Sequence, residues 1–219
     1  MPKPPNFPAP ASPDYDPSKP IATREAYGFA LKRLGAVNPH IVAISGDVKD
    51  STFSEIFEDA FPDHFHQGYI AEQNIVSAGV GLAAHGKVPF LDTYACFLTR
   101  AYDQVRMADI SRSNINLCGS HCGVSIGEDG LSQMALEDIA MFRAVHSSTV
   151  LYPSDAISAE RPTETTVGRA GMNYLRTSRP KFPIPYSKDL VQTISCNFRL
   201  LAHRVSSLFV HLVVRGVRF

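Results

Sequence analysis

The stretch HFHQGYIAEQNIVSAGVGLAAHGKVPFLDTY (64–94) places a strand, a helix and a second strand in immediate succession. Its two ends, HFHQGYI (64–70) and VPFLDTY (88–94), are short segments rich in aromatic and aliphatic residues, as strands usually are. The middle, AEQNIVSAGVGLAAHG (71–86), has small residues along one face and ends at a glycine, which is typical of a helix. This succession, with short connections, indicates two parallel strands joined by a crossover helix.

The same alternation continues on both sides of this stretch. Four further segments are predicted to be strands: IVAIS (41–45), INLCGSH (115–121), STVLYP (148–153) and MNYLRTS (172–178). The sequence therefore predicts an α/β fold, a doubly wound and mostly parallel sheet of about six strands with helices on both faces. The exception is ERPTETTVGRAG (160–171), where Pro162 and the loss of apolar periodicity leave open whether the helix expected between the last two strands forms.

Composition divides the chain into three parts. Residues 1–20 are rich in proline and are expected to form an extended linker that follows another domain. Residues 21–180 carry the strand and helix pattern and are predicted to be one domain. Residues 181–219 are an atypical tail without a recognised domain, which either adds one or two strands or comes from a misread gene boundary.

Charge and cysteine usage exclude several classes of protein. Lys and Arg number 21, as do Asp and Glu, so the zero net charge points neither to nucleic acid nor to a membrane surface as partner. Four cysteines do not make a disulfide framework in a chain of this length. No apolar run approaches the roughly 20 residues of a membrane helix, and the N-terminus lacks a secretory signal. We therefore expect a cytoplasmic protein.

Five polar loops follow predicted strands. The carboxyl ends of parallel strands lie on one edge of a sheet, and ligands bind at that edge. The loops are GDVKDS (46–51), IAEQN (70–74), DTYACF (92–97), SHCGVSIGEDG (120–130) and RTSRP (176–180). We expect the chemistry of the domain to come from them.

Glu72 directly follows a predicted strand, in the first turn of the next helix. A carboxylate at that position is stabilised by the helix dipole, which is sufficient reason for its presence. Alternatively, a glutamate buried among apolar side chains retains a proton more readily and could share it with a heteroaromatic nitrogen. Tyr94 and Phe97 straddle another strand-to-helix loop, where they could stack on a flat ring or pack into the core.

Basic residues in two of the loops have more than one interpretation. Arg176 and Arg179 could bind a phosphate group in bidentate fashion, or they could be a solvated surface pair. Lys49 and Ser51, in the loop after the first long strand, could add hydrogen-bond donors to such a site.

Cys118, His121 and Cys122 lie close enough together to suggest zinc binding. We reject that interpretation because no second pair of ligands occurs elsewhere, so we assign no metal ligand to this chain. A cysteine–histidine nucleophile is also a weak interpretation, because adjacent side chains rarely point at each other. The glycines of the same loop would let the backbone approach a ligand closely.

Taken together and in order, these segments resemble transketolase of the animal type, and specifically its pyrimidine-binding middle domain. Any one segment alone is weak evidence for this family, whereas all of them together, in order and at matching spacing, are specific evidence for it. The resemblance covers about residues 20–180 and implies the fold that binds the pyrimidine of thiamine diphosphate. It rests on IATREAYG (21–28), STFSEIFE (51–58), FPDHF (61–65), YIAEQN (69–74), FLTRAYDQVRMADIS (97–111), SNINLCGSHCGVSIGEDG (113–130), SQMALEDIAMFR (132–143), YPSDA (152–156) and RTSRP (176–180).

The resemblance implies a cofactor, thiamine diphosphate, and residues that bind it. Glu72 matches the catalytic glutamate that hydrogen-bonds N1′ of the aminopyrimidine. Phe97 matches the aromatic residue stacked on that ring. Tyr94 lies beside it where the family usually has Phe, so the Tyr94 hydroxyl needs a partner. Gln133 matches a polar residue near the cofactor and the reacting oxygens of the substrate.

The resemblance also implies sugar phosphates as substrates. Ser51, His121 and Arg179 match residues that hold the sugar phosphate, Asp129 matches a carboxylate that binds a substrate hydroxyl, and Gln133 belongs to this set as well. The implied reaction is the transfer of a two-carbon ketol unit from a ketose to an aldose, as in the pentose phosphate pathway, by a cytoplasmic homodimer.

In that family a preceding domain holds the diphosphate and its divalent metal, Mg or Ca, through a Gly-Asp-Gly stretch that this sequence lacks. The resemblance therefore implies a fragment that supplies half of each site and requires a second transketolase-type subunit or a diphosphate-binding domain. We expect the chain alone to be inactive, whether it is a natural truncated product or an incomplete gene model. Two alternatives stay open: a non-catalytic dimerisation or regulatory module, and the pyrimidine half of another thiamine-dependent enzyme.

Overall fold

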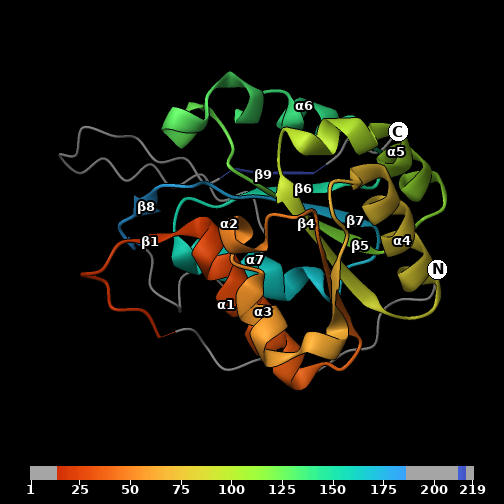
Figure 1. Cartoon of the computed structure of the whole chain (residues 1–219), viewed down its shortest axis with the longest axis horizontal. Helices are drawn as coiled ribbons and strands as arrows, with labels where there is room; N and C mark the ends of the chain where they lie inside the picture. Colours follow the sequence, from red (N-terminus) through yellow and green to blue (C-terminus); the bar gives the residue numbers. More distant parts are fainter. Residues whose placement is uncertain (1–13, 186–211, 216–219) are drawn as a thin grey trace.

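The computed structural model describes residues 14–185 and 212–215, and its centre is one seven-stranded sheet. Six strands are mutually parallel, which confirms the predicted doubly wound sheet (Figure 1). In spatial order the strands are β3 (Phe65–Gln67), β2 (Ile41–Ser45), β4 (Val88–Tyr94), β5 (Ile115–Ser120), β7 (Met172–Arg176), β6 (Thr149–Tyr152) and β9 (Leu212–Arg215). The seventh, β9, lies in the predicted tail and runs antiparallel to β6. Predictions about residues 1–13, 186–211 and 216–219 lie outside the described residues.

Helices cover both faces of the sheet (Figure 1). One face carries α1 (Thr23–Val37), α3 (Glu55–Ala60) and α7 (Ala156–Thr166), and the other carries α4 (Glu72–Ala84), α5 (Tyr102–Ile110) and α6 (Asp138–Arg143). The remaining short elements are α2 (Lys49–Thr52), the 3₁₀ turns η1 (Pro62–His64), η2 (Phe97–Ala101), η3 (Val124–Asp129) and η4 (Leu131–Gln133), and the strand pair β1 (Ile21–Ala22) and β8 (Lys181–Phe182). No helix of the described part is both long and apolar enough to cross a bilayer.

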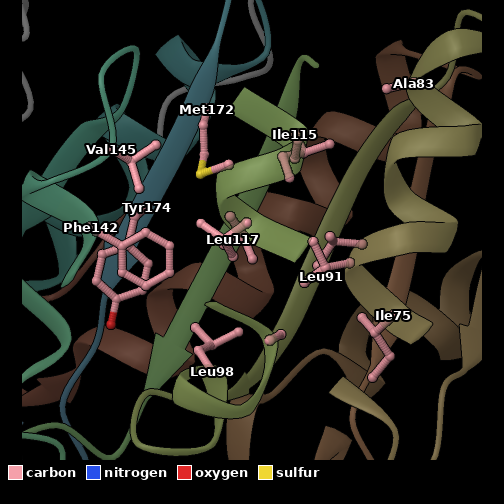
Figure 2. Close-up of a cluster of buried hydrophobic side chains, with 14 of the residues drawn as sticks. Ile75, Ala83, Leu91, Leu98, Ile115, Leu117, Phe142, Val145, Met172 and Tyr174 are labelled. Carbon is pink, nitrogen blue, oxygen red and sulfur yellow. The ribbon is translucent and has the colours of Figure 1, made fainter. Parts of the chain in front are cut away.

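The sheet has one hydrophobic core on each of its two faces, because the side chains of a buried strand point alternately to the two faces. In β4, Leu91 packs against the layer of α4 and α5, whereas its neighbour Phe90 packs on the side of α1 and α3. Figure 2 shows the first core, in which Leu117 is central and the stacked rings of Phe142 and Tyr174 close one end. Each such side chain contributes about 1.5–3 kcal/mol through burial, so the sheet is a rigid platform for its loops.

The doubt about a helix in residues 160–171 is resolved in part, because α7 spans Ala156–Thr166 with Pro162 inside it. A capping box begins the helix, and its side that contains Pro162 is buried. On the same helix the buried Glu160 carboxylate forms an ion pair with Arg33 of α1. Tertiary packing and a paired charge therefore outweigh the roughly 3 kcal/mol by which an internal proline disfavours a helix.

Two other elements are shorter than their sequence patterns suggest. The strand predicted at 64–70 keeps only Phe65–Gln67, because the chain leaves the sheet at Gly68 and Tyr69 has a positive φ of 52°. The segment SQMALEDIAMFRAV (132–145), whose pattern predicts a helix, is α-helical only over Asp138–Arg143, and the 3₁₀ turn η4 that begins after Gly130, a glycine with positive φ, already ends at Gln133.

The order of the strands creates a reversal between β2 and β4. From β2 the chain goes to β3 on one side and then returns to β4 on the other side of β2. In open parallel sheets such a reversal opens a crevice at the carboxyl ends of the two strands. The connection that leaves β2 contains Ser51, and the connection that leaves β4 begins at Ala95 and contains Phe97. The topology thus brings two of the predicted polar loops together.

Candidate active site

Glu72 is the first residue of α4 and is only 2% exposed. Nη1 of Arg100, in η2, lies 3.1 Å from one of its carboxylate oxygens, and the Arg100 side chain itself is half exposed. Within the described chain, that oxygen receives no hydrogen bond of good geometry. A buried carboxylate oxygen that keeps acceptor capacity is suited to a ligand that brings its own donor.

Aromatic rings form a stack beside the same turn. The rings of Tyr94, at the end of β4, and Phe97, at the start of η2, are 5.1 Å apart and nearly parallel. On its other side Tyr94 stacks on the imidazole of His121 at 4.0 Å. Because η2 carries both Phe97 and Arg100, the partner of Glu72, the stack and the carboxylate belong to one part of the crevice.

Tyr94 also links this stack to the loop after β2. Its hydroxyl donates a hydrogen bond to Oγ of Ser51 at 3.1 Å, which supplies the partner that the sequence analysis required. The backbone carbonyl of Ser51 in turn accepts from Nη1 of Arg24 at 2.7 Å. Two hydrogen bonds therefore join Tyr94 of β4 to Ser51 of α2 and Ser51 to Arg24 of α1.

His121 is buried and has a positive φ of 57°. Burial, the charge of Arg24 and the charge of Arg179, in that order, lower the pKa of His121 to about 4, so the ring is neutral at pH 7. Nε2 lies 3.3 Å from Nη1 of Arg24, and Nδ1 lies 3.0 Å from Oγ of Ser120. Because a guanidinium can only donate, Nε2 accepts, and the proton of the neutral ring resides on Nδ1.

Arg24 was not assigned a role from the sequence, although its position contains a signal. It lies in the first turn of α1, where the helix dipole disfavours a cation. Gly28 lets α1 approach this closely, since a Cβ there would lie 2.3 Å from the carbonyl oxygen of Phe53. The guanidinium sits over the Phe53 ring at 5.1 Å. A cation held at an unfavourable helix end by dedicated contacts indicates a site for an anion.

Arg179 and Asp129 are in direct contact. Nη1 of Arg179 donates to the Asp129 carboxylate at 3.2 Å and to the carbonyl of Ile126, and Nη2 donates to Glu128 at 2.9 Å. The charge of Arg179 also acts on Arg24 and on His121, whose pKa values it lowers after the larger effect of burial. Two guanidinium groups and an imidazole thus converge at the carboxyl end of the sheet.

Other candidates are placed differently. Gln133 lies in η4 and accepts a hydrogen bond from its neighbour Ser132, with no contact to the stack that the structure records within residues 14–185. The hypothesis that Arg176 binds phosphate is wrong, because its side chain is buried and makes a bidentate pair with Asp138 at 2.7 and 3.2 Å. Lys49 points to Glu58, with which it pairs at 2.6 Å.

The fold and the site define an α/β domain with a parallel sheet, whose carboxyl edge carries a buried, incompletely paired carboxylate and stacked aromatic rings. The family model "Transketolase, pyrimidine binding domain" matches residues 19–185, and the chain belongs to this family.

Curated relatives and solved structures agree with this membership. The chain is 56% identical to transketolase of Rattus norvegicus over 185 residues, which are 84% of this chain and 30% of the relative. It is 53% identical to transketolase-like protein 2 of Mus musculus, with 77% of this chain and 27% of the relative covered. The chain therefore spans less than a third of the length of these relatives.

Among solved structures, a split-gene transketolase described as an inactive β4 tetramer superposes with a TM-score of 0.73 at 34% identity, covering 83% of this chain and 59% of that chain. Transketolase of Campylobacter jejuni superposes with a TM-score of 0.74 at 22% identity, covering 79% of this chain and 28% of that one. The second likeness shows the fold alone.

Proposed function

We propose that the chain is the part of a transketolase that binds the aminopyrimidine of thiamine diphosphate, for the transfer of a two-carbon ketol unit between sugar phosphates. The single observation that carries this proposal is the buried Glu72 carboxylate, one oxygen of which lacks a well-aligned donor in the described chain while aromatic rings stack nearby. Membership of the pyrimidine-binding family supports the choice of ligand.

The residues present fit such a cofactor. Glu72 would share a proton between the oxygen that faces Arg100 and a pyrimidine nitrogen, and Phe97 would cover one face of the ring, with Tyr94 behind it. When bound, thiamine diphosphate supplies the electron sink for the two-carbon unit, and the protein contributes orientation and electrostatics. We propose that a separate diphosphate-binding domain holds the diphosphate and its Mg or Ca ion.

The substrate phosphate is proposed to bind between Arg24, Ser51, His121 and Arg179, whose side chains converge on one region. Arg179 is engaged by Glu128 and Asp129, so a phosphate dianion would compete with those carboxylates for it. Once released, Asp129 could accept a hydrogen bond from a substrate hydroxyl. Gln133, on the adjoining turn, is proposed to reach the reacting oxygens once the site is complete.

We propose that the chain acts only together with a second transketolase-type subunit or a diphosphate-binding domain, in the cytoplasm. The family model that matches the chain is that of a pyrimidine-binding domain, which supports this proposal. The structure at 34% identity is also of a split transketolase that is described as inactive.

The test is a coupled assay with xylulose 5-phosphate and ribose 5-phosphate. The full chain is assayed alone and after addition of a separately produced diphosphate-binding domain, and thiamine diphosphate binding is measured by calorimetry in parallel. We expect turnover only in the mixture. Turnover by the chain alone, or a mixture that binds no cofactor, would refute the proposal.

The matched pair of variants is Glu72→Gln and Glu55→Gln, since both glutamates are the first residue of a helix. We expect Glu72→Gln to lower kcat of the mixture about 100-fold or more, while cofactor affinity falls much less. Glu55→Gln lies in α3, on the other face of the sheet, and should leave both quantities unchanged. Equal activity of the two variants would show that the Glu72 carboxylate is not needed for catalysis.

A further inference from the structure

Asp92 places a carboxyl group inside the sheet. It lies on the central strand β4 and is fully buried. Its Oδ1 accepts hydrogen bonds from Ser45 of β2 at 2.8 Å, from Thr52 of α2 at 2.6 Å and from Ser54 at 3.0 Å. Three hydroxyl groups from the segment that leads from β2 into α3 therefore converge on one oxygen atom.

The other oxygen of Asp92 has no hydrogen-bond partner, and Asp92 forms no ion pair, within residues 14–185. The titratable groups that face it are Tyr27 of α1 and Cys118 of β5, both uncharged and buried. Burial raises the pKa of Asp92 to about 6 although the three hydroxyls act to lower it. A buried carboxylate without a cation is unfavourable for stability, so another requirement must retain it.

The segment that Asp92 holds cannot keep its conformation alone. Helix α2 has only four residues and ends at Phe53, which has a positive φ of 61°. So short a helix has no intrinsic stability in water. Its contacts with β4 and with α1 therefore fix the position of Ser51.

Asp92 and Tyr94 are two residues apart on β4, so both side chains lie on the same face of the strand. Asp92 holds the end of α2 through Thr52, while the Tyr94 hydroxyl holds Ser51 one residue earlier. The carbonyl of Ser51 in turn fixes the guanidinium of Arg24. One strand thus anchors the residues at which the phosphate is proposed to bind.

We propose that Asp92 is a positioning residue for the anion-binding part of the site: its carboxyl group clamps α2 so that Ser51 and Arg24 are in place before substrate arrives. This inference rests on the proposed function, because it assumes that Arg24 and Ser51 bind an anion. Asp92 itself touches neither cofactor nor substrate.

The experiment uses the full chain, with inorganic phosphate as the probe and backbone amide NMR as the readout. Asp92→Ala removes the acceptor, whereas Asp92→Asn keeps an oxygen where Oδ1 is. We expect Asp92→Ala to speed amide exchange over residues 49–54 about tenfold and to raise the Kd for phosphate about fivefold or more, and Asp92→Asn to restore most of both. A purely structural role would lower stability without changing the phosphate Kd of the folded molecules.

Asp109→Ala is the matched control. Asp109 accepts a hydrogen bond from the backbone amide of Ser147 at 3.1 Å and another from the Ser147 hydroxyl. Ser147 lies just before the amino end of β6, away from the crevice. We expect this variant to leave phosphate affinity and exchange over residues 49–54 unchanged. If Asp92→Ala does not fold, Thr52→Val removes the shortest of the three bonds from the other side and should raise the phosphate Kd about threefold.

The outcomes separate this inference from the proposed function. A wild-type chain whose amides near Arg24 do not respond to phosphate would overturn the anion site, and the role of Asp92 with it. A normal wild-type response, together with Asp92→Ala and Thr52→Val Kd values within a factor of about two of wild type, would overturn the role of Asp92 alone.

Discussion

Replacing Asp92 by asparagine should change how the stability of the chain depends on pH. In the folded protein, burial raises the pKa of Asp92 from its ordinary value of 3.8 to about 6. A carboxyl group whose pKa is higher when folded binds its proton more tightly in the native state. Its contribution to stability is therefore fully present below about pH 4 and is lost as the pH rises through about 6.

The magnitude follows from the same pair of values. The difference between 3.8 and about 6 corresponds to about 3 kcal/mol, since a tenfold change in proton affinity is worth about 1.4 kcal/mol. The Asp92→Asn protein has no group that titrates at this position. The stability of the wild type relative to the variant should therefore fall by roughly 2–3 kcal/mol between pH 4 and pH 8, because part of the full difference is already lost at pH 4.

The assay is urea unfolding of both proteins at five pH values across that range, followed by circular dichroism. His121 titrates in the same window, because its pKa is lowered to about 4, and its contribution decreases as the pH falls through that value. His121 is present in both proteins, so its contribution cancels in the difference between the two curves. The new amide group of the variant displaces the difference by a constant and leaves its slope unchanged.

A difference curve that stays flat to within about 0.5 kcal/mol from pH 4 to pH 8 would contradict the reasoning, because it would show that Asp92 ionises in the folded protein as it does in water. A curve of the opposite slope would mean that the three hydroxyl donors outweigh burial. Either result would also remove the argument that this carboxylate is retained at the expense of stability.

Three further substitutions test separate parts of the structure. Arg24→Ala should weaken phosphate binding about tenfold, since it removes a charge-assisted donor, and amide NMR titration measures this. Gly119→Ala should destabilise the chain by about 1–3 kcal/mol in urea unfolding, because the added Cβ would lie 2.4 Å from the hydroxyl of Tyr174; unchanged stability would contradict it. Arg176→Met should lower stability by about 3–5 kcal/mol at pH 7 by leaving Asp138 buried without its partner, and much of that loss should disappear in a double variant with Asp138→Leu.

The sheet could be predicted because the sequence pattern that identifies each strand lies within a few neighbouring residues. Most strands are short apolar runs with both sides buried, and most are followed by a helix within a few residues, so the alternation is visible in the sequence alone. The helix α7 could not be predicted in the same way. What keeps Pro162 inside a helix is the packing of α7 on α1 and the pair between Glu160 and Arg33, residues that are far apart in the sequence.

The residues of the candidate site were likewise predictable only where their sequence signal is local. Glu72, Tyr94 and Phe97 were found because they follow strands and match a family pattern, and their roles stay predictions. Arg24 and Asp92 were missed because each acts across space: Arg24 reaches the site from α1, and Asp92 reaches three hydroxyls of another segment from inside a strand. A basic residue in the first turn of a helix breaks a local rule, as does a charged residue inside a buried strand, and these are the sequence signals for Arg24 and Asp92.

Among the buried carboxylates of the described chain, Asp138 and Glu160 are paired differently from Glu72 and Asp92. Far from the crevice or beneath it, charges are matched: Asp138 has Arg176 and Glu160 has Arg33. Glu72 alone among these buried acids has a partner that is itself half exposed and poorly aligned, and Asp92 has hydroxyl donors but no cation within the described chain. Glu72 begins the connection that leaves β3, and Asp92 lies inside β4, whose carboxyl end borders the crevice. At Asp92 an apolar or amide side chain would suit stability better, whereas the helix dipole already favours a carboxylate at Glu72. The ligands proposed above would account for the incomplete pairing of both: one donates a hydrogen to Glu72, and the other carries a negative charge that needs Arg24 and Ser51 held in place.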